Sequence, residues 1–145
     1  MVFLSGGDPA YLASVLDGTA CWTAIVKGVR SGLAYGGCSA GVAALGERAI
    51  RPKDAANPAP GLRLFDGTNF GPHWDTMDRY LPGRRRALVE GLGGDARLVG
   101  IDERTAMVGD GRAWSAVGRG RVHVLDNGTW SEYPAGTTFA LDLIP

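Results

Sequence analysis

The sequence of 145 residues has the length of one domain, and its hydrophobic content of 45% is sufficient for a substantial core. Fifteen basic and fifteen acidic residues give a formal charge of zero, which excludes recruitment to nucleic acid or an anionic membrane by net charge. No apolar run approaches the roughly 20 residues of a membrane span, and Met1 to Leu4 is too short for a signal peptide. We therefore expect a single cytoplasmic domain, residues 1–145. Cys21 and Cys38 lack the spacing of a metal site and are expected to be reduced thiols, so we expect no metal and no cofactor.

The first half of the chain alternates between strand and helix patterns. Val2 to Leu4 is a short apolar run that ends in a glycine turn, and Asp8 followed by Pro9 is typical of a helix start. Thr19 can cap a second helix, which Gly32 ends. A second strand is expected at 33–35, a further helix at 40–45, and a loop rich in Pro, Ala and Gly at 50–69.

The second half is predicted to contain one helix and several short strands. The helix is expected over 84–92, and the strands over 98–101, 106–108, 113–117 and 122–125. Glycine-containing turns at 109–111 and 126–128 make part of this region antiparallel. The whole pattern predicts an α/β fold with a mostly parallel sheet flanked by helices, whose functional groups gather at the carboxyl ends of the strands.

The segment Gly37-Cys38-Ser39-Ala40-Gly41 matches G-x-S-x-G, the turn that presents a nucleophilic serine between a strand and a helix. Alone the match is weak, because 23 of the 145 residues are glycine. Its context supports it, since an apolar strand precedes the turn and a helix follows. Cys38 is a rival nucleophile, but the glycine spacing favours Ser39.

A serine nucleophile needs a base, and the chain offers His73 and His123. His123 lies in an alternating strand pattern and is expected to be a surface or packing residue. His73 follows Phe70 in a loop fixed by Gly and Pro, so we expect it to be the base. Sequence spacing does not choose the acidic partner of the base, for which the candidates are Glu47, Asp54, Asp75, Asp78 and Glu103. Asp75 and Asp78 can equally cap a turn or helix.

Four blocks together resemble the dipeptidase E and cyanophycinase family of serine peptidases. In chain order they are Ser5-Gly6-Gly7-Asp8, Gly37-Cys38-Ser39-Ala40-Gly41, Gly71-Pro72-His73-Trp74 and Gly100-Ile101-Asp102-Glu103. The 34 residues from Ser39 to His73 are too few for the common α/β-hydrolase layout. The resemblance implies a fold like that of class I glutamine amidotransferases, with serine in place of their cysteine nucleophile.

The resemblance also assigns roles to individual residues. It makes Ser39 the nucleophile, His73 the base and Asp54 the acidic member of the triad, with the Gly7 and Ala40 amides as the oxyanion hole. It implies cleavage of dipeptides with an N-terminal aspartate. Gly6 in the glycine turn and a basic side chain would bind that substrate. The arginines that could bind its aspartate side chain are Arg79, Arg84, Arg85 and Arg86, of which we select Arg79 and Arg85.

Relative to the family, about two amino-terminal βα units are missing, which would leave the first strand at an exposed sheet edge. We therefore expect a second copy of the chain to cover that edge, as a homodimer or higher homo-oligomer. The expected function is a serine peptidase for small peptides, with no nucleic-acid or membrane partner. The alternatives are a non-catalytic binding or scaffold protein and a hydrolase of β-aspartyl polymer or esters.

Overall fold

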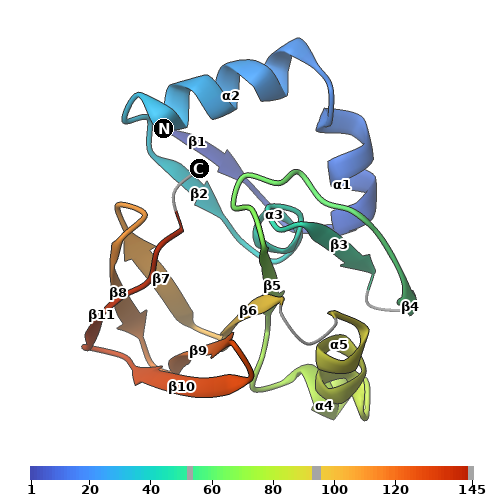
Figure 1. Ribbon diagram of the computed structural model, residues 1–145, viewed down its shortest axis with the longest axis vertical. Coiled ribbons are helices and arrows are strands. Elements are labelled where there is room, and N and C mark those ends of the chain that lie inside the picture. The colour runs from blue at the N-terminus through green and yellow to red at the C-terminus, as the bar shows by residue number, and fades with distance from the viewer. Residues whose placement is uncertain (52–53, 93–95, 144–145) are drawn as a thin grey trace.

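The computed structural model describes residues 1–51, 54–92 and 96–143; the side chains of 54–57 also lie outside that description. The chain forms several small mixed sheets with helices packed around them (Figure 1), which confirms the expected α/β class. None of the described helices is long and apolar enough to cross a membrane. Figure 1 shows α3 (Ala40–Ala43) near the centre of the molecule, where it contacts strands of three different sheets.

The amino-terminal unit is a parallel strand pair connected by two helices. Its elements are β1 (Val2–Leu4), α1 (Pro9–Leu16), α2 (Ala20–Arg30) and β2 (Tyr35–Gly37). The predicted caps are present, because Asp8 Oδ1 accepts the Ala10 and Tyr11 amides, each at 2.9 Å, and Thr19 Oγ1 accepts the Trp22 amide at 3.1 Å.

The second strand begins at Tyr35, two residues later than expected, because Leu33 takes part in the capping of the carboxyl end of α2. The Leu33 amide donates to the Gly28 carbonyl at 2.8 Å, and the Gly32 amide donates to the Val29 carbonyl at 3.0 Å. Gly32 has a φ of 95°, so this ending is a Schellman motif.

The segment expected as a loop at 50–69 contains strands, so that prediction is wrong over much of its length. The strands β3 (Arg48–Arg51) and β4 (Asp54–Pro60) pair antiparallel with a register shift, and β5 (Thr68–Pro72) follows. Within the described residues β4 pairs with β3 alone, and such an edge strand tolerates proline, which cannot donate to a ladder. The Pro and Ala composition therefore concealed the strand.

The carboxyl-terminal half consists of antiparallel strands around one parallel pair. The remaining elements are α4 (Met77–Tyr80), α5 (Arg84–Leu92), β6 (Arg97–Ile101), β7 (Thr105–Gly109), β8 (Ala113–Gly118), β9 (Arg121–Asp126), β10 (Thr129–Pro134) and β11 (Thr138–Ala140). One sheet has the order β10-β9-β6-β5 and another the order β11-β8-β7. Only β1–β2 and β5–β6 are parallel among the described pairings, so the expected mostly parallel sheet is present only in part, because hairpins dominate this half.

The parallel pairs bring four glycine-containing or polar segments to the middle of the molecule. The carboxyl ends of β1 and β2 lead into Ser5 and Cys38, and those of β5 and β6 lead into His73 and Asp102. The main core beneath them includes Ala44, Leu45, Phe70, Val99 and Val122, whereas Trp74, Leu88, Leu92 and Leu98 form a second cluster. These two clusters hold the strand ends in fixed positions.

Candidate active site

Ser39 lies on a strained turn between β2 and α3, with a φ of 50° and a ψ of −113°. Non-glycine residues adopt positive φ only where the surrounding structure requires it. A Cβ added at Gly41 would lie 2.0 Å from the Leu4 carbonyl oxygen, and one added at Gly37 would lie 2.6 Å from the Gly41 oxygen. Both glycines of the motif are therefore required by the backbone packing around Ser39.

Tyr35 stabilises the same turn through a hydrogen bond. Its hydroxyl donates to the Gly41 carbonyl at 2.6 Å. Burial raises the pKa of Tyr35, so the phenol remains a hydrogen-bond donor across the physiological range.

His73 follows β5 directly and also has a positive φ, of 59°. Its Nε2 lies 3.0 Å from Ser39 Oγ. The next residue, Trp74, anchors the loop: its amide donates to the Ile101 carbonyl at 3.0 Å, and its ring covers Gly71 and Gly100. These two glycines are paired in the β5–β6 register, and a Cβ on Gly100 would lie 2.6 Å from the indole. The glycines therefore provide the flat surface that seats Trp74 and orients His73.

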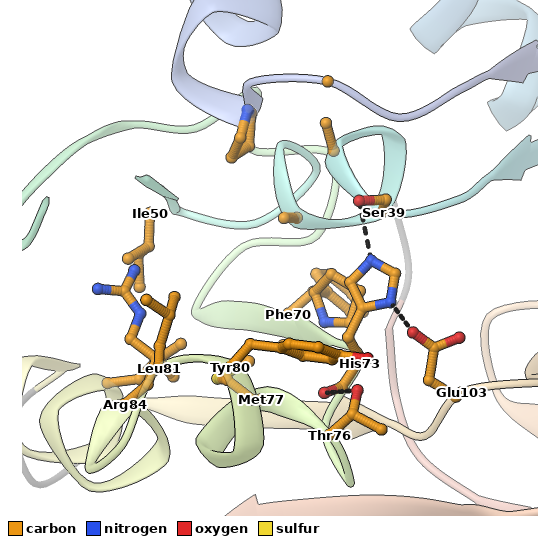
Figure 2. Close-up of a pocket in the computed structure, with 17 residues that line it drawn as sticks. Ser39, Ile50, Phe70, His73, Thr76, Met77, Tyr80, Leu81, Arg84 and Glu103 are labelled. Carbon is orange, nitrogen blue, oxygen red and sulfur yellow. Dashed lines mark hydrogen bonds and ion pairs between the residues drawn. The ribbon is translucent and has the colours of Figure 1, made fainter. Parts of the chain in front are cut away.

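Glu103 completes the hydrogen-bonded chain on the other side of the imidazole. Its Oε1 lies 2.7 Å from His73 Nδ1, and Figure 2 shows Ser39, His73 and Glu103 in sequence along the two dashed contacts. Asp75 positions Glu103, because its Oδ1 accepts the Glu103 amide at 2.8 Å. A hydroxyl, an imidazole and a carboxylate in this order can move a proton from the hydroxyl and stabilise the imidazolium that forms.

Among the described side chains, the carboxylate that contacts His73 is that of Glu103, whereas the acidic member expected at Asp54 falls on a side chain that is not described. The Asp54 backbone starts β4, but its side chain lies outside the described residues, whereas Glu103 occupies His73 Nδ1. Glu103 was one of the five sequence candidates, and the β5–β6 pairing explains its position, since both strands end at the same edge.

Asp78 has a structural role at the start of α5. Its Oδ1 accepts the Arg85 amide at 2.9 Å and its Oδ2 accepts Arg85 Nε at 2.7 Å. These hydrogen bonds, the backbone one first, lower the pKa of Asp78.

His123 and Cys38, the alternatives to His73 and Ser39, contact other side chains. His123 is largely buried, and its Nε2 lies 2.9 Å from Asp102 Oδ1 while its Nδ1 lies 3.4 Å from Glu132 Oε1. Cys38 is exposed, and its Sγ lies 3.9 Å from Ser5 Oγ. Ser39, rather than Cys38, therefore carries the contact with an imidazole, and His123 is a packing residue as expected.

A pocket of about 350 Å³ opens beside Ser39. Gly7 and Ala40, the expected oxyanion-hole residues, line it, and Gly6 lies beside the serine, since a Cβ there would be 3.5 Å from Ser39 Cβ. The rest of the wall is mostly apolar, a feature that no motif indicated; it includes Pro9, Ala43, Ile50, Phe70, Pro72, Met77, Tyr80, Leu81 and Leu88.

The arginine that lines the pocket is not one of the two selected from the sequence. Within the part of the chain that the structure describes, the arginine lining the pocket is Arg84, rather than Arg79 or Arg85. Arg84 is buried and donates to the Arg51 carbonyl. Arg85 is held by Asp78 and lies over the Trp74 ring, 5.8 Å from its centroid. Consecutive residues of a helix point in different directions, and the sequence alone does not say which of the adjacent arginines faces the pocket.

Comparison with known proteins agrees with the resemblance of the four sequence blocks. The sequence profile of peptidase family S51 matches residues 1–117. The chain is 35% identical over 133 residues to a cyanophycinase of Synechococcus elongatus, covering 86% of this chain and 41% of that protein. It is 33% identical over 135 residues to a cyanophycinase of Trichormus variabilis, covering 86% and 44%.

Among solved structures, a crystal structure of a peptidase from an acI-B1 Actinobacterium superimposes with a TM-score of 0.83 at 30% identity. The match covers 96% of this chain and 58% of that one. The chain thus spans about two fifths of the length of these curated relatives. The resemblance expected from the four sequence blocks is confirmed.

Proposed function

The chain belongs to peptidase family S51, and from that premise we propose that it is a serine peptidase with Ser39 as nucleophile, His73 as base and Glu103 as the acidic member. The observation that carries the proposal is the continuous contact from Ser39 Oγ to His73 Nε2 at 3.0 Å and from His73 Nδ1 to Glu103 Oε1 at 2.7 Å. Glu103 replaces Asp54 in this proposal.

In the first step Ser39 Oγ attacks the scissile carbonyl carbon while His73 Nε2 takes the hydroxyl proton. The Gly7 and Ala40 amides stabilise the negative charge that develops on the carbonyl oxygen. The C–N bond then breaks, and His73 returns the proton to the departing amine. Glu103 stabilises the imidazolium during both proton transfers and keeps the neutral imidazole proton on Nδ1.

In the second step a water molecule replaces the amine. His73 takes one proton from the water as its oxygen bonds to the acyl carbon, and the bond from that carbon to Ser39 Oγ breaks. The proton passes from His73 to Ser39 Oγ, which restores the starting state. The balance of the two steps is one peptide bond and one water converted to one acid and one amine.

For the substrate we propose small peptides with aspartate on the acyl side, as the resemblance implied. We retain Arg79, rather than Arg85, as the residue that binds the aspartate carboxylate, because Arg79 is exposed on α4 whereas Arg85 is paired with Asp78. The similarity to cyanophycinases makes a β-aspartyl polymer the second substrate candidate.

The test is hydrolysis of aspartyl dipeptides, β-aspartyl polymer and aspartyl esters by the wild-type protein and by Ser39→Ala. We expect the substitution to abolish turnover while the circular dichroism spectrum is unchanged. Ser131→Ala, at an exposed position on β10, is the matched control and should retain full activity. Undiminished hydrolysis by Ser39→Ala would rule out the proposed mechanism.

A non-catalytic binding or scaffold role is the alternative proposal. An active-site-directed fluorophosphonate separates the two functions. Labelling at Ser39 indicates an enzyme, whereas a folded protein that resists labelling indicates a scaffold.

For the assembly we propose that a second copy covers the β1 side of the molecule. Within the described residues β1 pairs with β2 alone, and Phe3 on β1 is 57% exposed; Tyr11 and Val15 of α1 are exposed as well. An open strand edge with apolar neighbours favours association. Light scattering at micromolar concentration should give the mass of a dimer or higher oligomer, and a folded monomer would contradict this assembly.

A further inference from the structure

The pocket beside Ser39 is built mainly from the segment that follows His73. Thr76, Met77, Tyr80 and Leu81 come from α4 and its end, and Leu88 comes from α5. Figure 2 shows Tyr80, Met77 and Leu81 on one side of His73 and Glu103 on the other. The space next to the imidazole is thus bounded on this side by apolar side chains, and Glu103 borders the pocket on the other side of His73.

The burial of the wall residues suits an apolar occupant. Phe70 and Leu88 are buried at 8% and 4% exposure and form the inner wall. Tyr80 and Leu81 border the same pocket but are 73% and 36% exposed. Apolar side chains that remain exposed at the mouth of a preformed pocket gain most from a ligand that removes them from water.

The charged groups of the pocket have roles within the protein. His73 and Glu103 contact each other, and Arg84 donates to the Arg51 carbonyl. A charged substrate side chain in this space would lose its hydration against a largely apolar wall, which costs more than placing an aliphatic or aromatic side chain there.

The direction of the reaction identifies which part of the substrate reaches the pocket. In the proposed mechanism His73 Nε2 protonates the departing amine, so the residue that carries that amine lies against the imidazole. Gly7 and Ala40, which bind the carbonyl oxygen of the acyl part, belong to the opposite wall, formed by the turns after β1 and β2. The pocket-lining side chains Met77 and Tyr80 of α4 therefore face the leaving residue, and Arg79, which is not among the lining residues, does not belong to this wall.

We propose that this pocket takes an apolar side chain on the leaving residue, so that the preferred substrates are aspartyl peptides followed by leucine, methionine or phenylalanine. This inference rests on the proposed peptidase function and adds a specificity for the residue after the scissile bond. An apolar side chain that fills such a pocket improves kcat/KM by about tenfold or more over its absence.

The test measures kcat/KM for Asp-Leu, Asp-Gly and Asp-Lys, with aspartate α-methyl ester as a substrate whose leaving group is too small to fill the pocket. Wild-type protein should prefer Asp-Leu to Asp-Gly by about tenfold or more, and Asp-Lys should not exceed Asp-Gly. Leu81→Ala should reduce the Asp-Leu to Asp-Gly ratio several-fold. Leu33→Ala is the matched control, because Leu33 has the same 36% exposure and does not line the pocket; it should keep the wild-type ratio.

A second variant, Leu81→Lys, changes the charge at the mouth and should raise the rate with Asp-Glu relative to Asp-Leu, which a merely unfolded protein would not do. Equal kcat/KM for Asp-Leu and Asp-Gly, with hydrolysis still dependent on Ser39, overturns the pocket inference and leaves the peptidase function standing. Absence of Ser39-dependent turnover of all these substrates, the methyl ester included, and of β-aspartyl polymer overturns the peptidase function itself.

Discussion

Replacing Glu103 with glutamine should slow turnover without changing the fold, because it removes the charge that stabilises protonated His73. The Oε1 and Nδ1 atoms are 2.7 Å apart, and the two side chains are 44% and 47% exposed. At that exposure an effective dielectric constant between about 40 and about 80 gives an attraction of about 1.5 to about 3 kcal/mol. The loss corresponds to a fall in kcat of about 10- to 100-fold.

The measurement is steady-state kinetics on an aspartyl dipeptide, with kcat and KM determined separately. We expect the fall in kcat and little change in KM, since Glu103 acts on the imidazole in the transition state. Glu132→Gln is the matched control, because Glu132 also lies beside a histidine, His123, but does not line the pocket next to Ser39. A kcat for Glu103→Gln within twofold of wild type, or a larger loss for Asp54→Asn, would refute the reasoning.

Three other predictions follow from the structure. Gly41→Ala should abolish activity and lower the melting temperature, as measured by calorimetry, since its Cβ would lie 2.0 Å from a backbone carbonyl of β1. Asp75→Ala should lower kcat by several-fold, and Asp75→Asn should restore part of it, because an amide oxygen can still accept the Glu103 amide; equal activity of both variants and wild type would contradict a positioning role. Asp78 has a lowered pKa in the folded state, owing first to the Arg85 amide, so its stabilisation is complete above the ordinary carboxyl pKa of about 3.9 and is lost as the pH falls through the lowered value. Urea midpoints at pH 7 and in that acidic range should therefore differ less for Asp78→Asn than for wild type.

The amino-terminal elements and the turn that carries Ser39 could be predicted from sequence because their determinants are local. Asp8 and Thr19 cap helices through residues two or three positions away, and the glycines around Ser39 act within the turn itself. His73 could be selected because a rigid loop directly after an apolar strand is a typical position for a catalytic base.

The acidic partner could not be selected because it depends on a contact between distant segments. Glu103 reaches His73 across 30 residues through the parallel pairing of β5 with β6, and Asp75 joins the same network from the His73 loop. Asp54 lies closer to Ser39 in sequence, but sequence separation carries no information on which strand ends share an edge.

The pocket was missed for a related reason. Its apolar wall combines β3, β5, α4 and α5, and β3 lies beside a segment that was expected to be a loop. Arg84 faces this pocket while Arg85 turns to Asp78, a difference that follows from helix geometry and from the contact with Asp78.

The most direct test of the account is reaction with a fluorophosphonate probe, followed by intact-mass measurement and peptide mapping. We expect one covalent adduct per chain, located on Ser39, and no adduct on the Ser39→Ala protein. A folded wild-type protein that gains no adduct, or that carries the adduct on another residue, would contradict the assignment of Ser39 as the nucleophile.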